Sequence, residues 1–389
     1  MPANFSGSPS VSRCFGMLAS GLTLLTLTTA APALAQNRSD SPVIYTNHVV
    51  SRIPLSIHVI KIDRKSQDLR FSTILGGGSV LGMASLTDQL KVAPPELGAP
   101  LAAINGDFYE KAKGYPGRPR DLQVWNGEVV SHPSGHACFW IDANGQPRMT
   151  NIYSRFRVLW PAGNETPFWL NVERTNNTVV LYTAVIGPST LTKGGIEYQI
   201  EDSATPGGWR PLGTAQTREV RVVKVSAAGN TPLTRGSAVL SISPELTNKI
   251  PILAPGALLR LRTETVPDLP GVEMAIGGGP TLVENGKVLT WSGWVHLPHP
   301  RTAVGWSKDH IFFVVVDGRQ LDVSLGMTFS ELASYMLSLG CEQAMNLDGG
   351  GSAALWAFGS LRSNPSEGQE RPAPNALMVV KKTAAPAQK

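Results

Sequence analysis

The segment NLDGGGSAAL (residues 346–355) places the carboxylate of Asp348 directly before three glycines, Gly349, Gly350 and Gly351. Glycines adopt backbone angles that are closed to other residues, so successive amide N–H groups can converge on an anion. The alternative interpretation is a tight glycine turn capped by an aspartate. Three glycines, a flanking asparagine and two further segments of the same kind favour a ligand site.

Two other carboxylates follow apolar runs in the same way. In AAINGDFY (residues 102–109) a small apolar run ends in Asn105 and, two residues later, Asp107. In IFFVVVDGR a β-branched and aromatic run over residues 311–316 ends at Asp317, which is the pattern of a strand buried on both faces. An Asn-Gly-Asp sequence alone is usually a turn, because Asn and Asp bond their own backbone. Its likeness to the first segment makes Asp107 a candidate site residue.

The sequence between Asp317 and Asp348 predicts a helix over residues 328–339, with capping-box spacing at its start and a glycine at its end. With strands over residues 311–316 and about 344–347, this helix predicts a βαβ unit whose strands are parallel neighbours. Asp317 and Asp348 would then lie at one edge of a sheet. Ligands gather outside the carboxyl ends of parallel strands, so this edge is the expected site.

Six segments together resemble a known family. They are, in chain order, NGDFY, GGGPTLVENG, PRTAVGW, VVVDGR, NLDGGGSAAL and RPAPNALMVV, and they run from about residue 102 to residue 380. In this order they are similar to the phosphodiester glycosidases, the family of the uncovering enzyme, an N-acetylglucosamine-1-phosphodiester alpha-N-acetylglucosaminidase. The central segment VLYTAVIGPSTLT also resembles bacterial members. The resemblance implies hydrolysis of the bond between an anomeric sugar carbon and a phosphodiester oxygen, which releases a free sugar and a phosphomonoester.

Such a reaction builds positive charge on the sugar ring and negative charge on the departing phosphate, so the site needs carboxylates near the one and cations near the other. We predict that Asp107 and Asp348 form the carboxylate pair. Asp317 is a third catalytic candidate that can instead hold the neighbouring loop. The phosphate leaving group is a weak base, so a single carboxylate can suffice to activate water.

Arginines are the predicted phosphate ligands, because a guanidinium fork matches two phosphate oxygens in one plane. The candidates are Arg301 in HPRTAVGW and Arg371 in ERPAPN, each of which can alternatively form a salt bridge to a loop carboxylate. The loop of Gly277, Gly278 and Gly279 can add backbone donors. It lacks the Lys and Ser/Thr of a nucleotide P-loop.

Asparagines and aromatic residues are candidates for the sugar. Asn105, Asn346 and Asn375 can bond sugar hydroxyls or orient the aspartates, and each can equally be a buried turn residue. Aromatic rings stack on sugar faces, although large loop aromatics more often close a core. The tryptophans near the Arg301 segment are Trp291, Trp294 and Trp306.

The histidines do not form a recognisable metal or catalytic motif. His132 and His136 are four residues apart, but a proline and a glycine between them argue against one helical face, so we interpret both as loop histidines. His296 and His299 lie close to Arg301 and are interpreted as solvated, with pocket lining as the alternative. The chain has no HExxH, no GxSxG and no catalytic cysteine context, which argues against the usual metalloprotease and serine or cysteine hydrolase classes.

Residues 1–35 have the pattern of a signal peptide, with Arg13, an apolar core from Met17 to about Thr28, and small residues at a cleavage site in APALA. No later stretch approaches the roughly 20 apolar residues of a transmembrane helix. We therefore expect a secreted or periplasmic protein of the cell envelope, without a stable membrane span after signal cleavage.

Composition agrees with this setting. The formal charge of +5 and pI near 9.1 suit an anionic substrate or envelope surface. Nucleic-acid binding has little support, because there is no lysine-rich run, zinc-finger spacing or basic helix. After the leader, Cys138 and Cys341 remain, which can form one disulfide or stay as two separate buried thiols.

The expected fold class is α+β, with mixed β-sheets, few helices, glycine-rich active-site loops and a β-rich insertion. Asn-Gly between apolar runs in LQVWNGEVV and TLVENGKVL predicts two hairpins. The predicted organisation is a signal peptide over residues 1–35, an N-terminal part of the glycosidase domain over 36–151, the insertion over 152–266, a C-terminal part over 267–382, and a disordered tail over 383–389.

The hypothesis is an exported phosphodiester glycosidase of carbohydrate metabolism that acts on a glycosyl phosphate or phosphodiester-linked glycan. No cofactor is predicted to be required, although a calcium or magnesium ion is possible. One alternative is a metal-dependent phosphodiesterase with a metal held by Asp107, Asp317 and Asp348. Another is a non-catalytic glycan-binding protein of the envelope.

Overall fold

The computed structural model describes residues 41–50, 52–110, 115–290 and 297–382. The predicted signal peptide and the predicted C-terminal tail lie outside the described residues, as do Trp291, Trp294 and His296.

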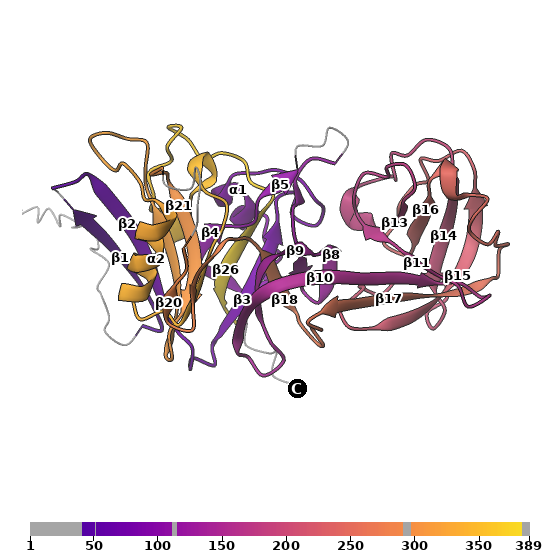
Figure 1. Cartoon of the computed structure of the whole chain (residues 1–389), viewed down its shortest axis with the longest axis horizontal. Helices are drawn as coiled ribbons and strands as arrows, with labels where there is room; N and C mark the ends of the chain where they lie inside the picture. The colour runs from indigo at the N-terminus through magenta and orange to yellow at the C-terminus, as the bar shows by residue number, and fades with distance from the viewer. Residues whose placement is uncertain (1–40, 51, 111–114, 291–296, 383–389) are drawn as a thin grey trace, which may run out of the picture. The chain divides into compact units, whose positions relative to one another are not determined.

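The first sheet has seven antiparallel strands and carries helix α2 against it (Figure 1). Its strands, in pairing order, are β1 (Val43–Val50), β2 (Leu55–Asp63), β22 (His310–Val316), β21 (Arg301–Trp306), β23 (Gln343–Asn346), β19 (Thr281–Glu284) and β20 (Lys287–Val288). Helix α2 (Phe329–Ser338) begins after Thr328 with the predicted capping box. Its Leu332 and Met336 pack with Val314 of β22 in one core cluster, so its apolar stripe is explained by burial against this sheet.

The predicted βαβ unit is wrong in one respect. Strands β22 and β23 run in the same direction but are not neighbours, because β21 lies between them and is antiparallel to both. The segment RTAVGW is itself a fully buried strand, and the chain through α2 crosses over it. The carboxyl ends of β22 and β23 still lie at one edge, which they share with the start of β21: Val316 pairs with Arg301, and Asn346 pairs with Ala303.

A second sheet of five antiparallel strands faces the first across a shared core. Its strands are β25 (Ser360–Leu361), β24 (Leu355–Ala357), β4 (Ala99–Asn105), β26 (Asn375–Lys381) and β3 (Leu69–Leu75). Ile104 of β4 and Leu377 of β26 pack with Phe313 of β22 in the same cluster. Helix α1 (Leu86–Lys91) covers the other face through Leu86 and Leu90. The hairpin of β5 (Tyr109–Glu110) and β6 (Arg118–Pro119) follows β4.

The third sheet has twelve strands. In order they are β12 (Trp169–Leu170), β13 (Val179–Tyr182), β16 (Ala238–Ile242), β14 (Ile196–Asp202), β15 (Thr217–Ser226), β17 (Leu258–Val266), β10 (Pro147–Leu159), β9 (Ser134–Ile141), β18 (Met274–Gly277), β7 (Gln123–Trp125) and β8 (Glu128–Ser131), with β11 (Glu165–Pro167) on β10. Only β12 and β13 pair in parallel among these described strands. Strand β9 joins two cores: Ala137 and Phe139 face the shared core, whereas Cys138 and Trp140 face the core of the β-rich region.

The predicted insertion over residues 152–266 consists of strands and short 3-10 turns, without an α-helix in this fully described range. Its first boundary falls inside β10, which pairs with β9 in its first half and with β17 in its second (Figure 1). The sheet is therefore continuous across the boundary. The described residues belong to one compact unit that begins at Ser41. The domain boundaries within it stay a prediction.

The described chain is mostly β-structure, with α1 and α2 as its α-helices and 3-10 turns at η1 (Pro95–Leu97), η2 (Ala184–Ile186), η3 (Pro244–Leu246) and η5 (Gly350–Ser352). The predicted scarcity of helices is confirmed, but two short α-helices do not confirm the α+β class. Cys138 and Cys341 are unpaired and buried in different clusters, so the alternative of two separate thiols is confirmed. In the part that the structure describes, no helix has the length and apolar character to span a membrane.

Candidate functional site

A cleft of about 1170 Å³ opens at the sheet edge where β21 begins and β23 ends. The predicted site residues that line it are Gly278, Gly279, Arg301, Asn346, Asp348, Gly349, Gly350 and Arg371. Short backbone bonds fix this edge: Leu347 N–H donates to the Thr302 carbonyl at 2.8 Å, and Gly279 N–H to the Asn346 carbonyl at 2.7 Å. The Asn346 amide donates to the Gly279 carbonyl, while its Oδ1 is buried without a partner among the described residues.

Asp348 is the predicted carboxylate that reaches the cleft. Its side chain is 13% exposed, and its Oδ1 accepts the N–H of Gly349 at 2.9 Å. Burial raises the pKa of Asp348, although the Ser352 hydroxyl and the charge of Arg371 act in the opposite direction. The Asp348 carbonyl accepts the side-chain amide of Asn105 at 2.7 Å, which ties the loop to the end of β4.

Arg301 is a buried cation without a carboxylate partner among the described residues. It is 5% exposed, donates to the carbonyls of Met327 and Leu297, and lies 4.0 Å from the ring centroid of Phe329. Burial, followed by the charge of Arg319, lowers the pKa of Arg301 to about 10, so it stays charged at neutral pH. A buried charge is normally paired, and this one is available to an anionic ligand.

Arg319 is a cleft residue that the sequence analysis did not identify. It is the last residue of the quoted VVVDGR segment, has a positive φ of 61°, and forms no ion pair with any described residue. A Cβ at Gly350 would lie 3.0 Å from its Nη2, so the glycine leaves room for this guanidinium. His299, interpreted from sequence as solvated, lines the same part of the cleft, and burial and Arg301 lower its pKa.

Arg371 forms the salt bridges to loop carboxylates that were its alternative interpretation. It lies 3.4 Å from Glu367 and 3.9 Å from Asp348, and donates to the Ser352 hydroxyl at 2.8 Å. Arg371 therefore lines the cleft but is already paired with loop carboxylates.

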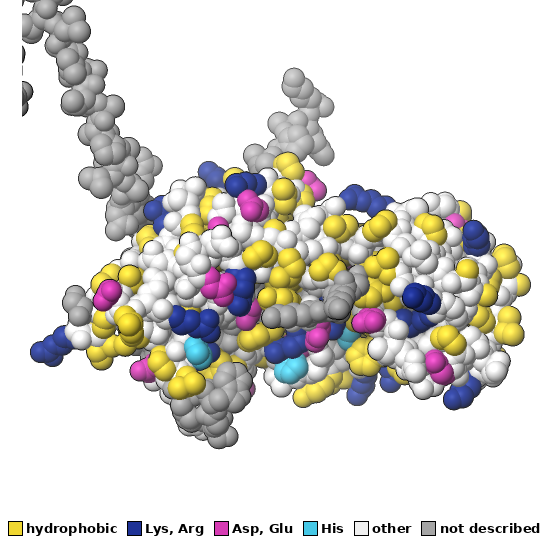
Figure 2. All heavy atoms as spheres, turned by 90° about the horizontal axis from the view of Figure 1, so that it is seen from above, with side chains coloured by type: hydrophobic (Ala, Val, Ile, Leu, Met, Phe, Trp, Pro, Cys, Tyr) yellow, Lys and Arg dark blue, Asp and Glu magenta, His cyan; other side chains and the backbone are white. Residues whose placement is uncertain are grey.

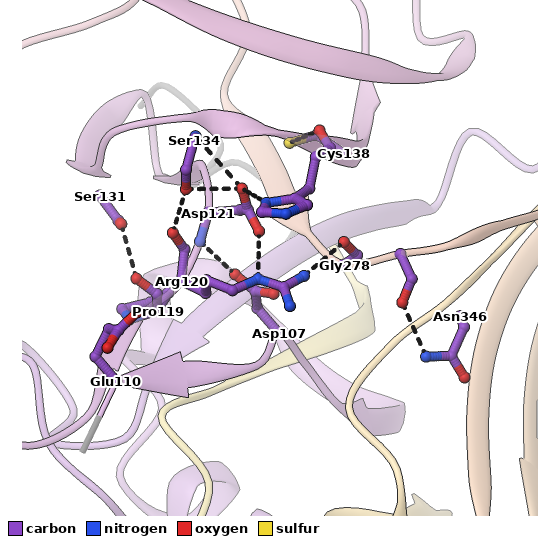
Figure 3. A network of polar contacts seen from close by, with 12 residues as sticks. Asp107, Glu110, Pro119, Arg120, Asp121, Ser131, Ser134, Cys138, Gly278 and Asn346 are labelled. Carbon is purple, nitrogen blue, oxygen red and sulfur yellow. Dashed lines mark hydrogen bonds and ion pairs between the residues drawn. The ribbon is translucent and has the colours of Figure 1, made fainter. Parts of the chain in front are cut away.

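Asp107 does not line the cleft; Figure 3 shows it beside Arg120 and Asp121. It is 1% exposed, its Oδ2 accepts the N–H of Asp121 at 2.7 Å, and its Oδ1 has no partner in the described chain. Burial, then the negative charge of Asp121, raise the pKa of Asp107 well above its usual range. Both effects favour the protonated form of this carboxyl.

Asp121 joins the buried carboxyl to the cleft surface. It has no solvent exposure and accepts bonds from Arg120 Nε, the Ser134 hydroxyl and His136 Nδ1, each at 2.9 Å; Figure 3 shows Ser134 and Arg120 converging on it. His136 lines the cleft, has a side chain 51% exposed, and has no described partner for its other ring nitrogen. Its interpretation as a loop residue is wrong: Gly135, at φ 95°, allows β9 to begin at Ser134, whereas His132 does lie in the connecting loop.

The remaining predicted residues support the site without lining it. Both carboxylate oxygens of Asp317 are bonded, to His58 at 2.8 Å and to Asn364 at 2.9 Å, as expected for the alternative role of holding a loop. Asn105 accepts from Thr302 and Ala354, and Asn375 accepts the N–H of Asp107 at 2.8 Å.

Gly277 and Gly351 are needed for close packing. A Cβ at Gly277 would overlap Asp121 and lie 2.7 Å from Asp107 Oδ2, and one at Gly351 would overlap Glu367. Trp306 is a buried core residue at 7% exposure.

The carboxylates proposed for a metal do not converge. Asp317 is committed to His58 and Asn364, and Asp107 does not line the cleft that Asp348 lines. Within the described ranges, no group of three or more His, Cys, Asp or Glu side chains is arranged to hold a metal ion. That no cofactor is required stays a prediction.

Unlike the cleft, the outer face drawn in Figure 2 has no concentration of positive side chains. On the face drawn in Figure 2, Lys and Arg side chains are scattered among Asp and Glu rather than gathered in one stripe. The unpaired arginines of the cleft are therefore not an extension of a basic patch on this face.

Comparison with known proteins gives a family match. Residues 191–380 match the model of the family described as phosphodiester glycosidase. This range contains five of the six quoted segments, from GGGPTLVENG to RPAPNALMVV, and begins inside the β-rich region.

Two solved structures share the fold. A hypothetical protein from Synechocystis gives a TM-score of 0.66 at 18% identity, covering 87% of this chain and 61% of that one. The "Putative exported protein" of Burkholderia pseudomallei K96243 gives a TM-score of 0.64 at 21% identity, covering 84% and 74%. A shorter match of 94 residues, at 37% identity, joins this chain to the SPbeta prophage-derived uncharacterized protein YomE of Bacillus subtilis (strain 168), covering 24% of this chain and 14% of that protein.

Proposed function

Because residues 191–380 carry the phosphodiester glycosidase domain, we propose that this protein hydrolyses the anomeric carbon–oxygen bond of a glycosyl phosphodiester. Water supplies the new oxygen on the sugar carbon, and the phosphate leaves as a phosphomonoester. The observation that carries the proposal is the presence of a buried, unpaired Arg301 and the carboxylate of Asp348 in one cleft.

Arg301 and Arg319 are suited to the phosphate. Both guanidinium groups lack a carboxylate partner among the described residues, and Arg301 is held in place by two backbone carbonyls and the ring of Phe329. Bonds from a charged donor to a phosphate strengthen as the leaving oxygen gains negative charge. The pair would therefore stabilise the departing phosphomonoester without a strong general acid.

Asp348 and His136 are suited to the sugar and the water. The carboxylate of Asp348 would stabilise positive charge at the anomeric carbon. His136 donates from Nδ1 to Asp121, which leaves its other ring nitrogen able to take a proton from the attacking water. Asp121 then acts as a positioning residue that fixes the tautomer and stabilises the protonated ring.

Asp107 has a different role from the one predicted. Its buried carboxyl accepts the Asp121 backbone N–H, supports Asp121 through that bond, and does not line the cleft. In this proposal the catalytic carboxylate is therefore Asp348, and Asp107 maintains the geometry of the Asp121–His136 pair.

The proposed setting is the cell envelope or the extracellular space, with a glycosyl phosphate or phosphodiester-linked glycan as the substrate. The leader-like residues 1–35 support export, as does the likeness to the Burkholderia protein described as exported. The unpaired arginines of the cleft support an anionic substrate.

Isotope labelling tests the reaction. Hydrolysis of a sugar-1-phosphodiester in oxygen-18 water should place the label in the free sugar and leave the phosphomonoester unlabelled. Label in the phosphate would instead establish the rival phosphodiesterase reaction, in which a phosphorus–oxygen bond breaks. Binding of these compounds without turnover would support the glycan-binding alternative.

A further inference from the structure

A second cavity, of about 230 Å³, lies beside the β7–β8 hairpin. Its wall includes Trp125 and Glu128 from the hairpin, Trp209 from the loop after β14, and Arg235. It shares no lining residue with the large cleft, and no role proposed above involves it.

Three polar groups around this cavity lack partners among the described residues. The indole nitrogens of Trp125 and Trp209 are both buried and unbonded. The Glu128 carboxyl makes no hydrogen bond or ion pair, and burial raises its pKa to about 7 against the opposing charges of Arg218 and Arg235. Buried polar groups are almost always satisfied, so the two buried indole nitrogens on one cavity indicate a missing partner.

The hairpin and the loop that carries Trp209 form two walls of the cavity, and local contacts fix the conformation of each. Trp125 and Glu128 face each other across the tight Asn126-Gly127 turn, whose positive φ angles of 49° and 80° suit those two residues. On the other side, the guanidinium of Arg218 lies 5.7 Å from the ring of Trp209 and donates to the Pro211 carbonyl at 2.7 Å. The aromatic surfaces are therefore fixed before any ligand arrives.

The chemistry of the wall selects the ligand class. Indole N–H groups only donate, so they need acceptors, which a cation does not supply. Glu128 and Arg235 carry opposite charges in the same wall, so the wall has no net preference for an anion. Hydroxyl groups both donate and accept, and flat aromatic rings offer an apolar surface to the C–H face of a sugar ring. The volume lies below the roughly 300–1,000 Å³ of pockets for drug-sized ligands, which limits the occupant to about one ring.

We infer that this second cavity is a binding site for a single neutral sugar ring, separate from the hydrolytic cleft. The inference does not depend on the proposed reaction. A saccharide bound here would hold a glycan chain on the protein at a distance from the cleft.

The test uses the full protein and four probes: glucose, galactose, mannose and N-acetylglucosamine. At least one should bind the wild-type protein and shift the indole resonances of Trp125 and Trp209 in ¹H–¹⁵N spectra. Trp209→Phe, which keeps a ring but removes the donor, and the isosteric Glu128→Gln should each weaken binding about tenfold. Asp348→Asn should bind the sugar as the wild type does, and Glu128→Gln should hydrolyse substrate at the wild-type rate.

The inference is overturned if none of the four sugars binds up to its solubility limit. It is also overturned if binding is unchanged in both cavity variants, or is lost in Asp348→Asn, since the sugar then binds elsewhere. The wild-type spectra decide the question even if a variant fails to fold. Failure of hydrolysis with retained binding would contradict only the proposed function.

Discussion

The Nδ1 atom of His136, on the cleft surface, lies 2.9 Å from Oδ1 of Asp121, a carboxylate with no solvent exposure. This pair joins an accessible ring to a buried charge and gives the cleft a group that can take a proton. Its role can be separated from simple packing by measuring kcat and KM separately.

We expect His136→Gln to lower kcat by about 10²- to 10⁴-fold, the usual contribution of a general base. A base takes its proton only in the transition state, so KM should stay nearly unchanged. Steady-state rates over a range of substrate concentrations measure kcat and KM separately. A raised KM with unchanged kcat would exclude His136 as the base.

Asp348→Asn should strongly reduce turnover while leaving KM for the phosphodiester nearly unchanged, because the phosphate ligands remain. We expect a loss of about 10²- to 10⁴-fold in kcat. Glu284→Gln is the matched control, because Glu284 also lines the cleft but is exposed. This variant should retain wild-type activity. Equal losses in the two variants would remove the special role of Asp348.

Arg319→Gln should raise KM for the phosphodiester by about 10- to 100-fold, the usual effect of losing hydrogen bonds from a charged donor. Inhibition by the phosphomonoester product should weaken by a similar factor. Arg155→Gln removes an exposed arginine of β10 and serves as the control. If product inhibition is unchanged in Arg319→Gln, the phosphate does not bind beside this residue.

Asp107→Asn should change how stability depends on pH. Because the pKa of Asp107 is raised in the folded protein, the folded state binds more protons than the unfolded state above the usual Asp range. The wild-type protein therefore loses stability as pH rises from that range toward the raised pKa. The asparagine variant lacks this loss, so its stability relative to the wild type should increase with pH.

Urea unfolding at several pH values measures this difference. Asp309→Asn is the control of opposite sign, because the bond from Lys65 lowers the pKa of Asp309. Parallel pH profiles for the wild type and Asp107→Asn would show that the buried carboxyl is not protonated.

Sequence patterns could predict those parts of the site that local order determines. Asn-Gly between apolar runs predicted the β7–β8 and β19–β20 hairpins, and capping residues predicted the start of α2. The end of a buried strand predicted where Asp348 would lie. In each case the signal lies within a few neighbouring residues.

Other parts of the site depend on pairing between distant strands. Nothing local shows that β21 separates β22 from β23, and Arg301 reaches the shared edge only through that pairing. Asp121 and His136 meet because β9 returns beside the residues that follow β6. Arg319 could have been identified, since it follows an aspartate already recognised at the end of a strand.

Strand β10 pairs with β9 along its first half and with β17 along its second half. Excising residues 152–266 would therefore cut β10 in its middle and uncover Cys138 and Trp140 of β9, which pack in the core of the β-rich region. Exposed apolar patches promote aggregation. A shortened protein should aggregate rather than fold as a minimal hydrolase, and the intact chain should melt in one cooperative step.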